Sequence, residues 1–386
     1  MTIKGSGEKG VSVSGGTVMM KQVDISEFTT GITMTGGRSL KLDGGSIRGN
    51  NRGMGINVTK GGTVTVEGVN ISDFATGIDM DGSGTLTVEN GTRIEFGHSG
   101  TGVKVGTSVT MTSLTGVTIE GSGGGMGVWV KGGTVMMDRV GITLQGSGTG
   151  IYMTGGETLT VSGGEITGVK MGITMMGGEV TISGTTTISF TGDDGYGVKV
   201  GDKVQSTSLT GVTIEGSGGN GVGVYAEGKN LTVKGTTKIT GVKVGISMKG
   251  SGTLTVEEGT RINFMGEYGI GYGVYVGKGV RAKLTDVTIT GSGSGYGVEV
   301  MVEEGAAALI GVTMTYKGDN RGAQGANTTS PSFIKVDGGK VLAEKVTITG
   351  NEQGLGVKVS NGGHVTLKQS HVPIQPTIHI THNLIL

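Results

Sequence analysis

Short runs of alternating apolar and polar residues recur along the whole chain, and Gly-rich segments separate them. The clearest run is Gly, then Val or Ile, then a variable residue, then an apolar residue or Ala. It stands at 102–105 as "GVKV" and returns at 127–130, 150–153 and 172–175. Alternation with a period of two is typical of a strand with one buried face, and no segment keeps a helical period. The pattern therefore predicts an all-β chain of many short strands.

Two further strand-like runs follow the first one in each repeat. The second is "TLTV" at 85–88 and the third is "GVTI" at 116–119, with Gly-rich corners such as "EGSGG" between runs. Three short strands and three corners describe one coil of a parallel β-helix, which buries its apolar face only by stacking on other coils. The sequence thus predicts a single solenoid of about 14–15 coils over residues 1–370. Residues 371–386 break the Gly-rich pattern, and we interpret them as a C-terminal cap or junction tail.

Stacked coils place equivalent residues above one another at a strand spacing of about 4.8 Å. The second residue of the first strand is Val or Ile, and β-branched side chains suit a pleated, buried surface. Five of the six Phe close the third strand and predict a corner stack, while the Met residues are interpreted as core filling. The expected inward column is Ile32, Ile56, Ile78, Val103, Val128, Ile151, Ile173, Val198, Val224, Ile246, Val274 and Val298.

Whole blocks of sequence occur twice. "TSLTGVTIEGSGG" stands at 112–124 and again at 207–219, and "GSGTLTVENGTRIEF" at 82–96 has a near copy at 250–264. A solenoid tolerates duplicated coils because each coil contacts only its neighbours. The copied residues are therefore scaffold, and function is expected where the coils differ.

Composition and charge exclude several functional classes. The 84 Gly and 3 Pro fit neither collagen nor a Pro-rich linker, and the chain has no Cys for disulfides, thiol chemistry or Cys-based metal sites. The 31 basic and 31 acidic residues cancel, so no whole-chain field favours nucleic acid. No stretch is apolar for the roughly 18 residues of a membrane helix, and the first residues do not form an apolar export signal.

The repeat as a whole resembles the passenger domains of bacterial autotransporters (type V secretion). The segments at 16–37 and 102–137 are most similar to Bartonella-type passengers. The resemblance implies a right-handed parallel β-helix that is secreted or held at the bacterial outer surface. It also implies a C-terminal translocator barrel as a partner, which this chain does not include. Relatives of this kind include adhesins and pro-angiogenic factors that act on host endothelium, so the resemblance implies a role in virulence.

The third residue of the first strand points outward and changes from coil to coil. Its order is Thr33, Asn57, Asp79, Lys104, Trp129, Tyr152, Thr174, Lys199, Tyr225, Ser247, Tyr275, Glu299, Lys335 and Lys358.

Exposed aromatic residues are typical of binding anchors, and ladder stacking without a ligand is the alternative interpretation. Trp129 and Tyr152 lie on consecutive coils, so we expect their rings within roughly 5–7 Å of each other. The binding candidates on this face are Trp129, Tyr152, Tyr225, Tyr275, Tyr272, Tyr296, Lys104 and Lys199.

The widest insertion, at 316–332, supplies a second candidate region. It is polar and Gly-rich, as expected of a surface loop. Its Lys317 and Asp319 belong to a "KGD" string similar to short integrin-binding tripeptides. A plain surface loop remains the alternative interpretation.

The sequence offers no catalytic constellation. We interpret the adjacent carboxylates Asp193 and Asp194 as a solvated corner, because a glycosidase needs two carboxylates that face one cleft. His98 in "GHSG" has no partner motif. Arg93 and Arg261 are copies of one scaffold position and are expected to form exposed ion pairs. No metal site and no cofactor are expected.

Three classes of function therefore remain open. The preferred one is a non-enzymatic passenger that contacts a host cell-surface receptor or glycan, as an adhesin or as a receptor ligand with growth-factor-like action on endothelium. The alternatives are a polysaccharide lyase or hydrolase on a β-helix scaffold and a passive structural stalk. We expect a monomer that does not bind nucleic acid.

Overall fold

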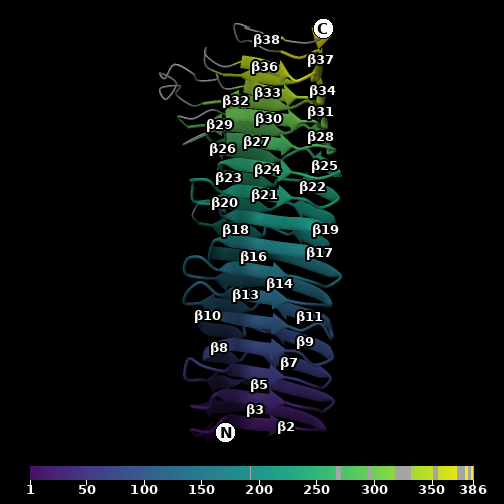
Figure 1. Cartoon of the computed structure of the whole chain (residues 1–386). Helices are drawn as coiled ribbons and strands as arrows, with labels where there is room; N and C mark the ends of the chain where they lie inside the picture. Colours follow the sequence, from purple (N-terminus) through teal and green to yellow (C-terminus); the bar gives the residue numbers. More distant parts are fainter. Residues whose placement is uncertain are drawn as a thin grey trace. The chain divides into compact units, whose positions relative to one another are not determined.

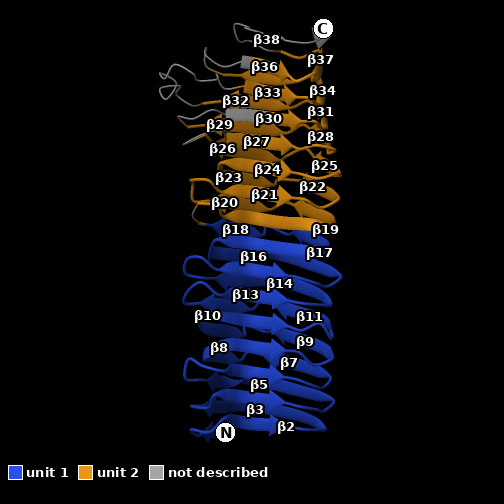
Figure 2. Cartoon of the chain, in the orientation of Figure 1, with its two compact units in different colours: residues 1–190 blue, residues 191–386 orange. Residues whose placement is uncertain are grey.

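Parallel pairing between strands of successive coils organises the chain. The computed structural model describes residues 1–191, 193–266, 271–293, 297–317, 332–350, 355–371, 379–380 and 384–385. These residues contain strands, turns and bends only, and no helix among them is long and apolar enough to cross a membrane. The chain is a right-handed parallel β-helix of about 14 turns, as the repeat predicts (Figure 1). It divides into two compact units, residues 1–190 and 191–386 (Figure 2).

Unit 1 repeats three classes of strand, which we call first, second and third strands in the order used for the sequence. Several long strands run through a corner and supply two classes. The third and first strands are β1 (Thr2–Lys4), β2 (Lys9–Val13), β4 (Thr30–Met34), β6 (Met54–Val58), β8 (Asn70–Met80), β10 (Arg93–Val105), β12 (Thr118–Gly121), β13 (Met126–Val130), β15 (Thr149–Met153) and β18 (Thr187–Phe190). The strands that contain a second-strand segment are β3 (Thr17–Ser26), β5 (Ser39–Arg48), β7 (Thr63–Glu67), β9 (Gly84–Glu89), β11 (Val109–Thr115), β14 (Thr134–Thr143), β16 (Thr158–Val169) and β17 (Met171–Ser183).

Unit 2 follows the same plan. Two short strands near its end continue the ladder, because β38 (His379–Ile380) pairs with β36 (Leu355–Ser360) and β39 (Leu384–Ile385) pairs with β37 (His364–Lys368). The first strands are β19 (Tyr196–Thr210), β21 (Val222–Ala226), β24 (Val244–Met248), β27 (Gly271–Val276), β30 (Gly297–Glu303), β33 (Ser332–Asp337) and β36 (Leu355–Ser360), of which β19 also runs on as a second strand. The remaining strands are β20 (Thr213–Gly216), β22 (Asn230–Lys234), β23 (Lys238–Val242), β25 (Thr253–Val256), β26 (Arg261–Met265), β28 (Arg281–Thr285), β29 (Thr288–Ser292), β31 (Ala306–Ile310), β32 (Thr313–Tyr316), β34 (Lys340–Glu344), β35 (Thr347–Thr349), β37 (His364–Lys368), β38 (His379–Ile380) and β39 (Leu384–Ile385).

The predicted inward column is confirmed in both units, with one exception. In unit 1 the residues from Ile32 to Ile173 pair in order and are completely buried, and in unit 2 so are Val198, Val224, Ile246 and Val274. Each coil thus adds β-branched surface to a continuous apolar core.

The exception is a register error of two residues in β30. Val274 pairs with Val300, not with Val298, so Val300 is the inward residue and Met301 replaces Glu299 in the outward column. The alternating string "GVEVMV" is apolar at every second residue, and a shift by two leaves the same residues on the same face. Alternation therefore predicts the buried face of β30 correctly, but not which of its residues pairs with Val274. On the next coil Ile334 pairs with Val300, which confirms that Phe333 fills the usual Gly position.

The predictions for Phe and for Met are each only partly correct, because Phe190 pairs with Val169 and Phe264 with Val242, so the Phe do not form one continuous corner stack. Phe74 pairs with Phe96, and all five third-strand Phe are buried. Many Met side chains are buried as well, but Met19, Met111, Met136 and Met176 are between 38% and 59% exposed. These four therefore do not fill the core.

The Gly that opens each first strand is required by the distance to the next coil. A Cβ at Gly102 would lie 2.6 Å from the carbonyl oxygen of Gly127 and would overlap the side chain of Ile119. Gly127 has the same 2.6 Å relation to Gly150. Real Cβ atoms do not approach backbone this closely, so any side chain here would push two coils apart.

We predict that Gly102→Ala lowers the free energy of unfolding by about 1–3 kcal/mol, the usual cost of overpacking a core. The control is Gly141→Ala in β14, where a Cβ would meet nothing within 4 Å and φ is not positive. Chemical denaturation of both variants measures the difference. Equal stability of the two would contradict the steric role of the Gly column.

Candidate binding surface

Four tyrosines surround a hollow on the first-strand face of unit 2. Two columns of the parallel ladder supply them. The column at the strand start reads Tyr196, Val222, Val244, Tyr272, and the outward column reads Lys199, Tyr225, Ser247, Tyr275. The hollow has a volume of about 410 Å³, inside the range of roughly 300–1,000 Å³ that is typical of small-ligand sites. It is lined by Tyr196, Val222, Tyr225, Val244, Ser247, Lys249, Tyr272, Tyr275 and Glu303.

The small side chain of Ser247 creates the space. Tyr225 and Tyr275 lie on the coils before and after it, so their Cα atoms are separated by two strand spacings, or about 9.6 Å. Each of these rings is held by a second tyrosine. Tyr196 packs edge-on against Tyr225 and Tyr272 against Tyr275, both with ring centroids 5.7 Å apart. The hollow therefore has two fixed aromatic walls.

A lysine ammonium lies between the walls. The Nζ of Lys249 is 5.7 Å from the ring centre of Tyr225 and 5.8 Å from that of Tyr275. Lys199 stands at the outer side of one wall, 4.9 Å from the Tyr196 ring and 5.9 Å from the Tyr225 ring. Within the described part of the chain, neither lysine forms an ion pair with a carboxylate.

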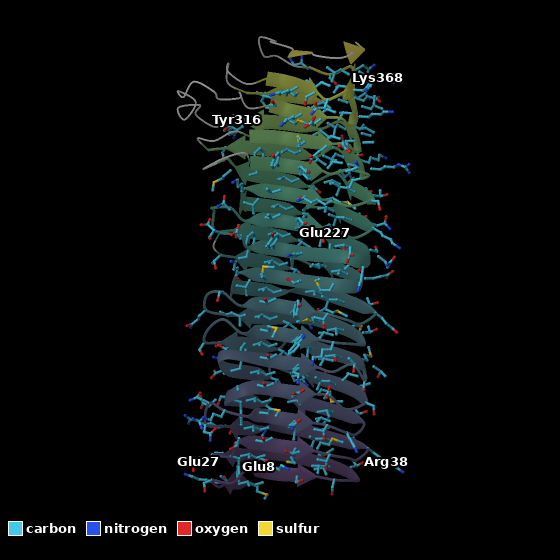
Figure 3. All side chains as sticks on the ribbon, in the orientation of Figure 1. Glu8, Glu27, Arg38, Glu227, Tyr316 and Lys368 are labelled. Atoms are coloured by element: carbon cyan, nitrogen blue, oxygen red, sulfur yellow. The ribbon has the colours of Figure 1, made fainter. Side chains whose placement is uncertain are left out.

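Carboxylates hold the hydroxyl ends of the two walls. Tyr225 donates a hydrogen bond of 2.5 Å to Glu227, the residue labelled in Figure 3, and Tyr275 donates one to Glu303. Burial is the main cause that raises the pKa of each of these two hydroxyls above its ordinary value, and the hydrogen-bonded carboxylate is the second. Burial and the charge of Glu303 raise the pKa of Tyr272 too. The phenols stay neutral donors at physiological pH.

The structure brings together only some of the predicted binding residues. Tyr225, Tyr272 and Tyr275 line the hollow and Lys199 flanks it, whereas Tyr296 lies outside the described residues. The sequence analysis missed Tyr196, Lys249 and Glu303, which are not in the outward column. Tyr196 had the same signal as Tyr272, since both stand two residues before "VKV" or "VYV".

The structure describes only the ends of the candidate insertion at 316–332. Lys317 is exposed, and its backbone N–H donates to the carbonyl of Gly291 at 2.9 Å. Asp319 lies outside the described residues, as does most of the 316–332 loop. The "KGD" interpretation stays a prediction.

Trp129 in unit 1 is the centre of a different arrangement. It pairs in register with Lys104 and Tyr152, as expected. Its ring, however, contacts the chain's own cations: the Nζ of Lys131 is 4.4 Å and that of Lys104 is 6.0 Å from the ring centre. Lys104 also forms a 2.6 Å ion pair with Asp79.

The expected ring contact between Trp129 and Tyr152 is not formed. The close ring pairs among the described residues are the two tyrosine pairs of unit 2. The indole Nε1 is buried and has no hydrogen-bond partner in the described structure.

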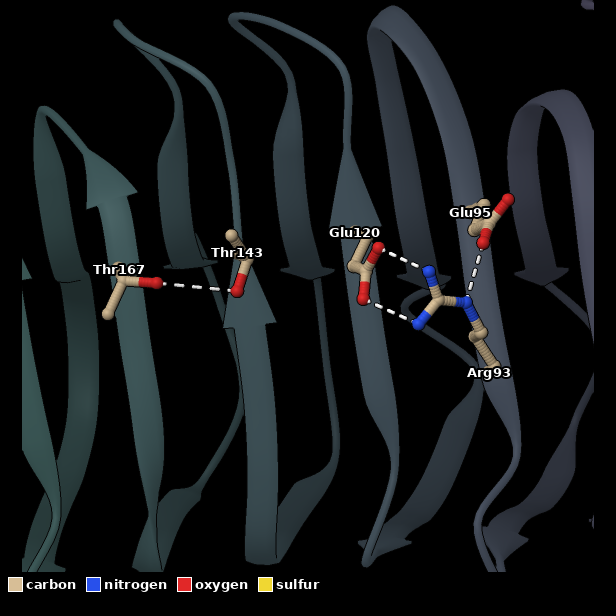
Figure 4. A network of polar contacts seen from close by, with 5 residues as sticks. All are labelled: Arg93, Glu95, Glu120, Thr143 and Thr167. Atoms are coloured by element: carbon tan, nitrogen blue, oxygen red, sulfur yellow. Dashed lines mark hydrogen bonds and ion pairs between the residues drawn. The ribbon is translucent and has the colours of Figure 1, made fainter.

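A hollow of about 370 Å³ lies beside the third strands of unit 1, and carboxylates line it. Glu95 and Glu120 pair on adjacent coils, and Asp73 lines the same hollow. Arg93 donates to both glutamates, at 2.5 Å to Glu95 and at 2.6 and 2.7 Å to Glu120 (Figure 4). Arg48 binds Asp73 at 2.7 Å. Glu95 and Glu120 are 25 residues apart in sequence and meet only through the pairing of adjacent coils, so no local motif predicts the cluster.

The remaining candidates are corner residues. Asp193 and Asp194 are exposed, and Asp193 accepts the backbone N–H of Asn220 at 3.1 Å, which fits the predicted solvated corner. The ion pair predicted for Arg93 is confirmed, but none is found for its copy Arg261 among the described residues. No group of three metal-binding side chains occurs in the residues that the structure describes.

Comparison with known families gives one match. The family described as "Right handed beta helix region" matches residues 1–140 and 149–317. Comparisons with the curated proteins and with the solved structures found no match.

We predict that Glu227→Gln lowers the pKa of Tyr225, because the mutation removes a negative charge that disfavours the phenolate. The pKa should stay above the ordinary value of about 10, since burial remains. Ultraviolet absorbance of ionised tyrosine during alkaline titration measures it, with Tyr225→Phe identifying the contribution of this residue. A titration that Glu227→Gln leaves unchanged would contradict the hydrogen bond.

Proposed function

Because the chain belongs to the right-handed β-helix family, we propose that it is a non-enzymatic binding protein of the autotransporter-passenger type. In this proposal it acts outside the bacterial cell as an adhesin or receptor ligand, and endothelial cells are the first host cells to test. The tyrosine hollow of unit 2, formed by Tyr196, Tyr225, Tyr272 and Tyr275, is the binding site.

One observation carries the proposal: the aromatic residues that vary between scaffold coils converge on a preformed cavity. Tyrosine supplies large apolar contact area at low rotamer cost, which is why it is enriched in binding hot spots. A passive stalk needs no such cavity. The Trp129 cluster supports binding less well, because Lys104 and Lys131 already cover its ring.

We predict that Tyr225→Ala with Tyr275→Ala weakens binding of the purified chain to endothelial cells by about 2 kcal/mol or more, the hot-spot scale. The double mutant to Phe keeps both rings, so it should lose far less. Flow cytometry with labelled protein measures binding, and circular dichroism confirms that each variant is folded.

Trp129→Ala with Tyr152→Ala is the matched comparison on the first-strand face of unit 1. A loss of binding in that variant, together with full binding by the Tyr225/Tyr275 variant, would move the binding site to unit 1. Full binding by both variants would remove the first-strand faces from consideration.

The carboxylate hollow of unit 1 favours a second candidate, a polysaccharide hydrolase or lyase. Glycosidases use two carboxylates that flank the scissile bond, and Glu95 and Glu120 line one cavity. Their shared partner Arg93 argues against it, because a glycosidase needs one carboxyl group free to donate a proton and the other free to attack or to activate water.

We expect no cleavage of pectins, glycosaminoglycans or β-glucans by the purified chain, measured as release of reducing ends or of unsaturated products. Glu95→Gln and Glu120→Gln are the diagnostic variants. Activity that either substitution abolishes would establish the enzyme and displace the binding proposal.

A further inference from the structure

We propose that the tyrosine hollow binds an acidic saccharide, whose sugar ring enters between Tyr225 and Tyr275 and whose carboxylate meets the ammonium of Lys249. This inference rests on the proposed binding function and adds the chemical class of the ligand. It follows from the shape of the gap, from the charge inside it and from the way its own carboxylates are engaged.

The gap has the form that a sugar ring requires. Tyr225 and Tyr275 stand two coils apart, and only the Ser247 side chain lies between them in the outward column. The floor continues through Val222 and Val244, which are apolar. A pyranose ring presents C–H groups on its faces, which pack on aromatic rings, and hydroxyls at its edge.

The charge in the gap points to an anion. Lys249 holds its ammonium at similar distances from the two walls, 5.7 and 5.8 Å from the ring centres. Within the described residues it has no carboxylate partner, whereas Glu227 and Glu303 each accept a tyrosine hydroxyl. The ammonium of Lys249 is thus available to an anion at the centre of the gap, whereas the carboxylates at its rim are already hydrogen-bonded to tyrosines.

The same geometry argues against a cationic ligand. Aromatic cages bind ammonium groups by cation–π attraction within about 6 Å of the ring centre. Lys249 already supplies a cation at this position for both walls. A second cation would meet like-charge repulsion in the same gap. A carboxylate would instead gain a charge-assisted hydrogen bond.

The test uses two ligand pairs that differ only in charge. One pair is 3′-sialyllactose and its carboxyl-reduced form, and the other is a hyaluronan tetrasaccharide and its carboxyl-reduced form. Titration calorimetry with the full chain measures the affinities. We expect each acidic member to bind at least tenfold more tightly than its neutral partner. Binding by one acidic member alone identifies the source of the carboxylate, and equal binding of acidic and neutral members overturns the charge assignment.

Two variants locate the ligand. Lys249→Gln keeps a polar side chain and should weaken acidic ligands about tenfold while leaving neutral ones unchanged. Lys238→Gln on the third-strand side of the same unit is the control and should change nothing. Ser247→Tyr fills the gap with a third ring of the ladder, so it should abolish binding and leave the protein folded. Full binding by Ser247→Tyr would overturn the location.

Failure of this inference is distinguishable from failure of the binding function. One outcome is that the Tyr225/Tyr275 variant loses cell binding but the acidic sugars neither bind nor compete. This outcome would support the tyrosine hollow as the cell-binding site and refute the ligand class. Acidic sugars that bind the wild-type chain and compete with cells would support both.

Discussion

The in-register parallel ladder between successive coils is the constraint on which the rest of the structure depends. It places each residue about one strand spacing from its equivalent in the next coil and so converts a sequence repeat into columns. The closest approach is at the first strand, where the backbone of one coil lies against the Cα of Gly102 and leaves no room for a side chain. A column is therefore nearly uniform where coils touch, as at the inward Val and Ile and at the Gly column, in which Phe333 is an exception. It is free to vary only where it faces solvent.

This constraint explains how much the sequence could predict. Core-facing and outward columns follow from alternation, and Tyr225 and Tyr275 could be assigned to one column from spacing alone. Solvent exposure does not follow from it, because Thr33, Thr174 and Ser247 of the outward column are buried. Alternation cannot detect a shift of two residues, so Val298 was taken for Val300. The ring positions were less predictable still. Which partner an indole or phenol contacts depends on rotamers and on residues just after the first strand, such as Lys131 and Lys249, whose side-chain directions the repeat does not specify.

The two copies of a duplicated block show which of its residues are shared and which are substituted. Arg93 and Arg261 occupy the same position in two copies of one block, but Glu95 in the first copy is Asn263 in the second. On the adjacent coil Glu120 pairs with Glu95, whereas Thr290 pairs with Asn263. The arginine therefore gains its ion pairs only in the first copy. Its presence in both copies fits duplication of one block, and the carboxylates at this point distinguish the copy in unit 1.

The outward column shows two ways in which a solenoid can use aromatic residues. Around Trp129 the preceding coil supplies Lys104 and the same coil supplies Lys131, so the chain's own cations contact the ring, while the buried Nε1 has no hydrogen-bond partner among the described residues. Around Ser247 the aromatic ladder is interrupted by one small residue, and the rings on either side are tied back by Glu227 and Glu303 rather than by each other. A ladder that served stability alone would gain from a large side chain at this point, since a third ring would bury more apolar area. The small residue at position 247 instead leaves the gap open, and under the proposed function a ligand would complete the column.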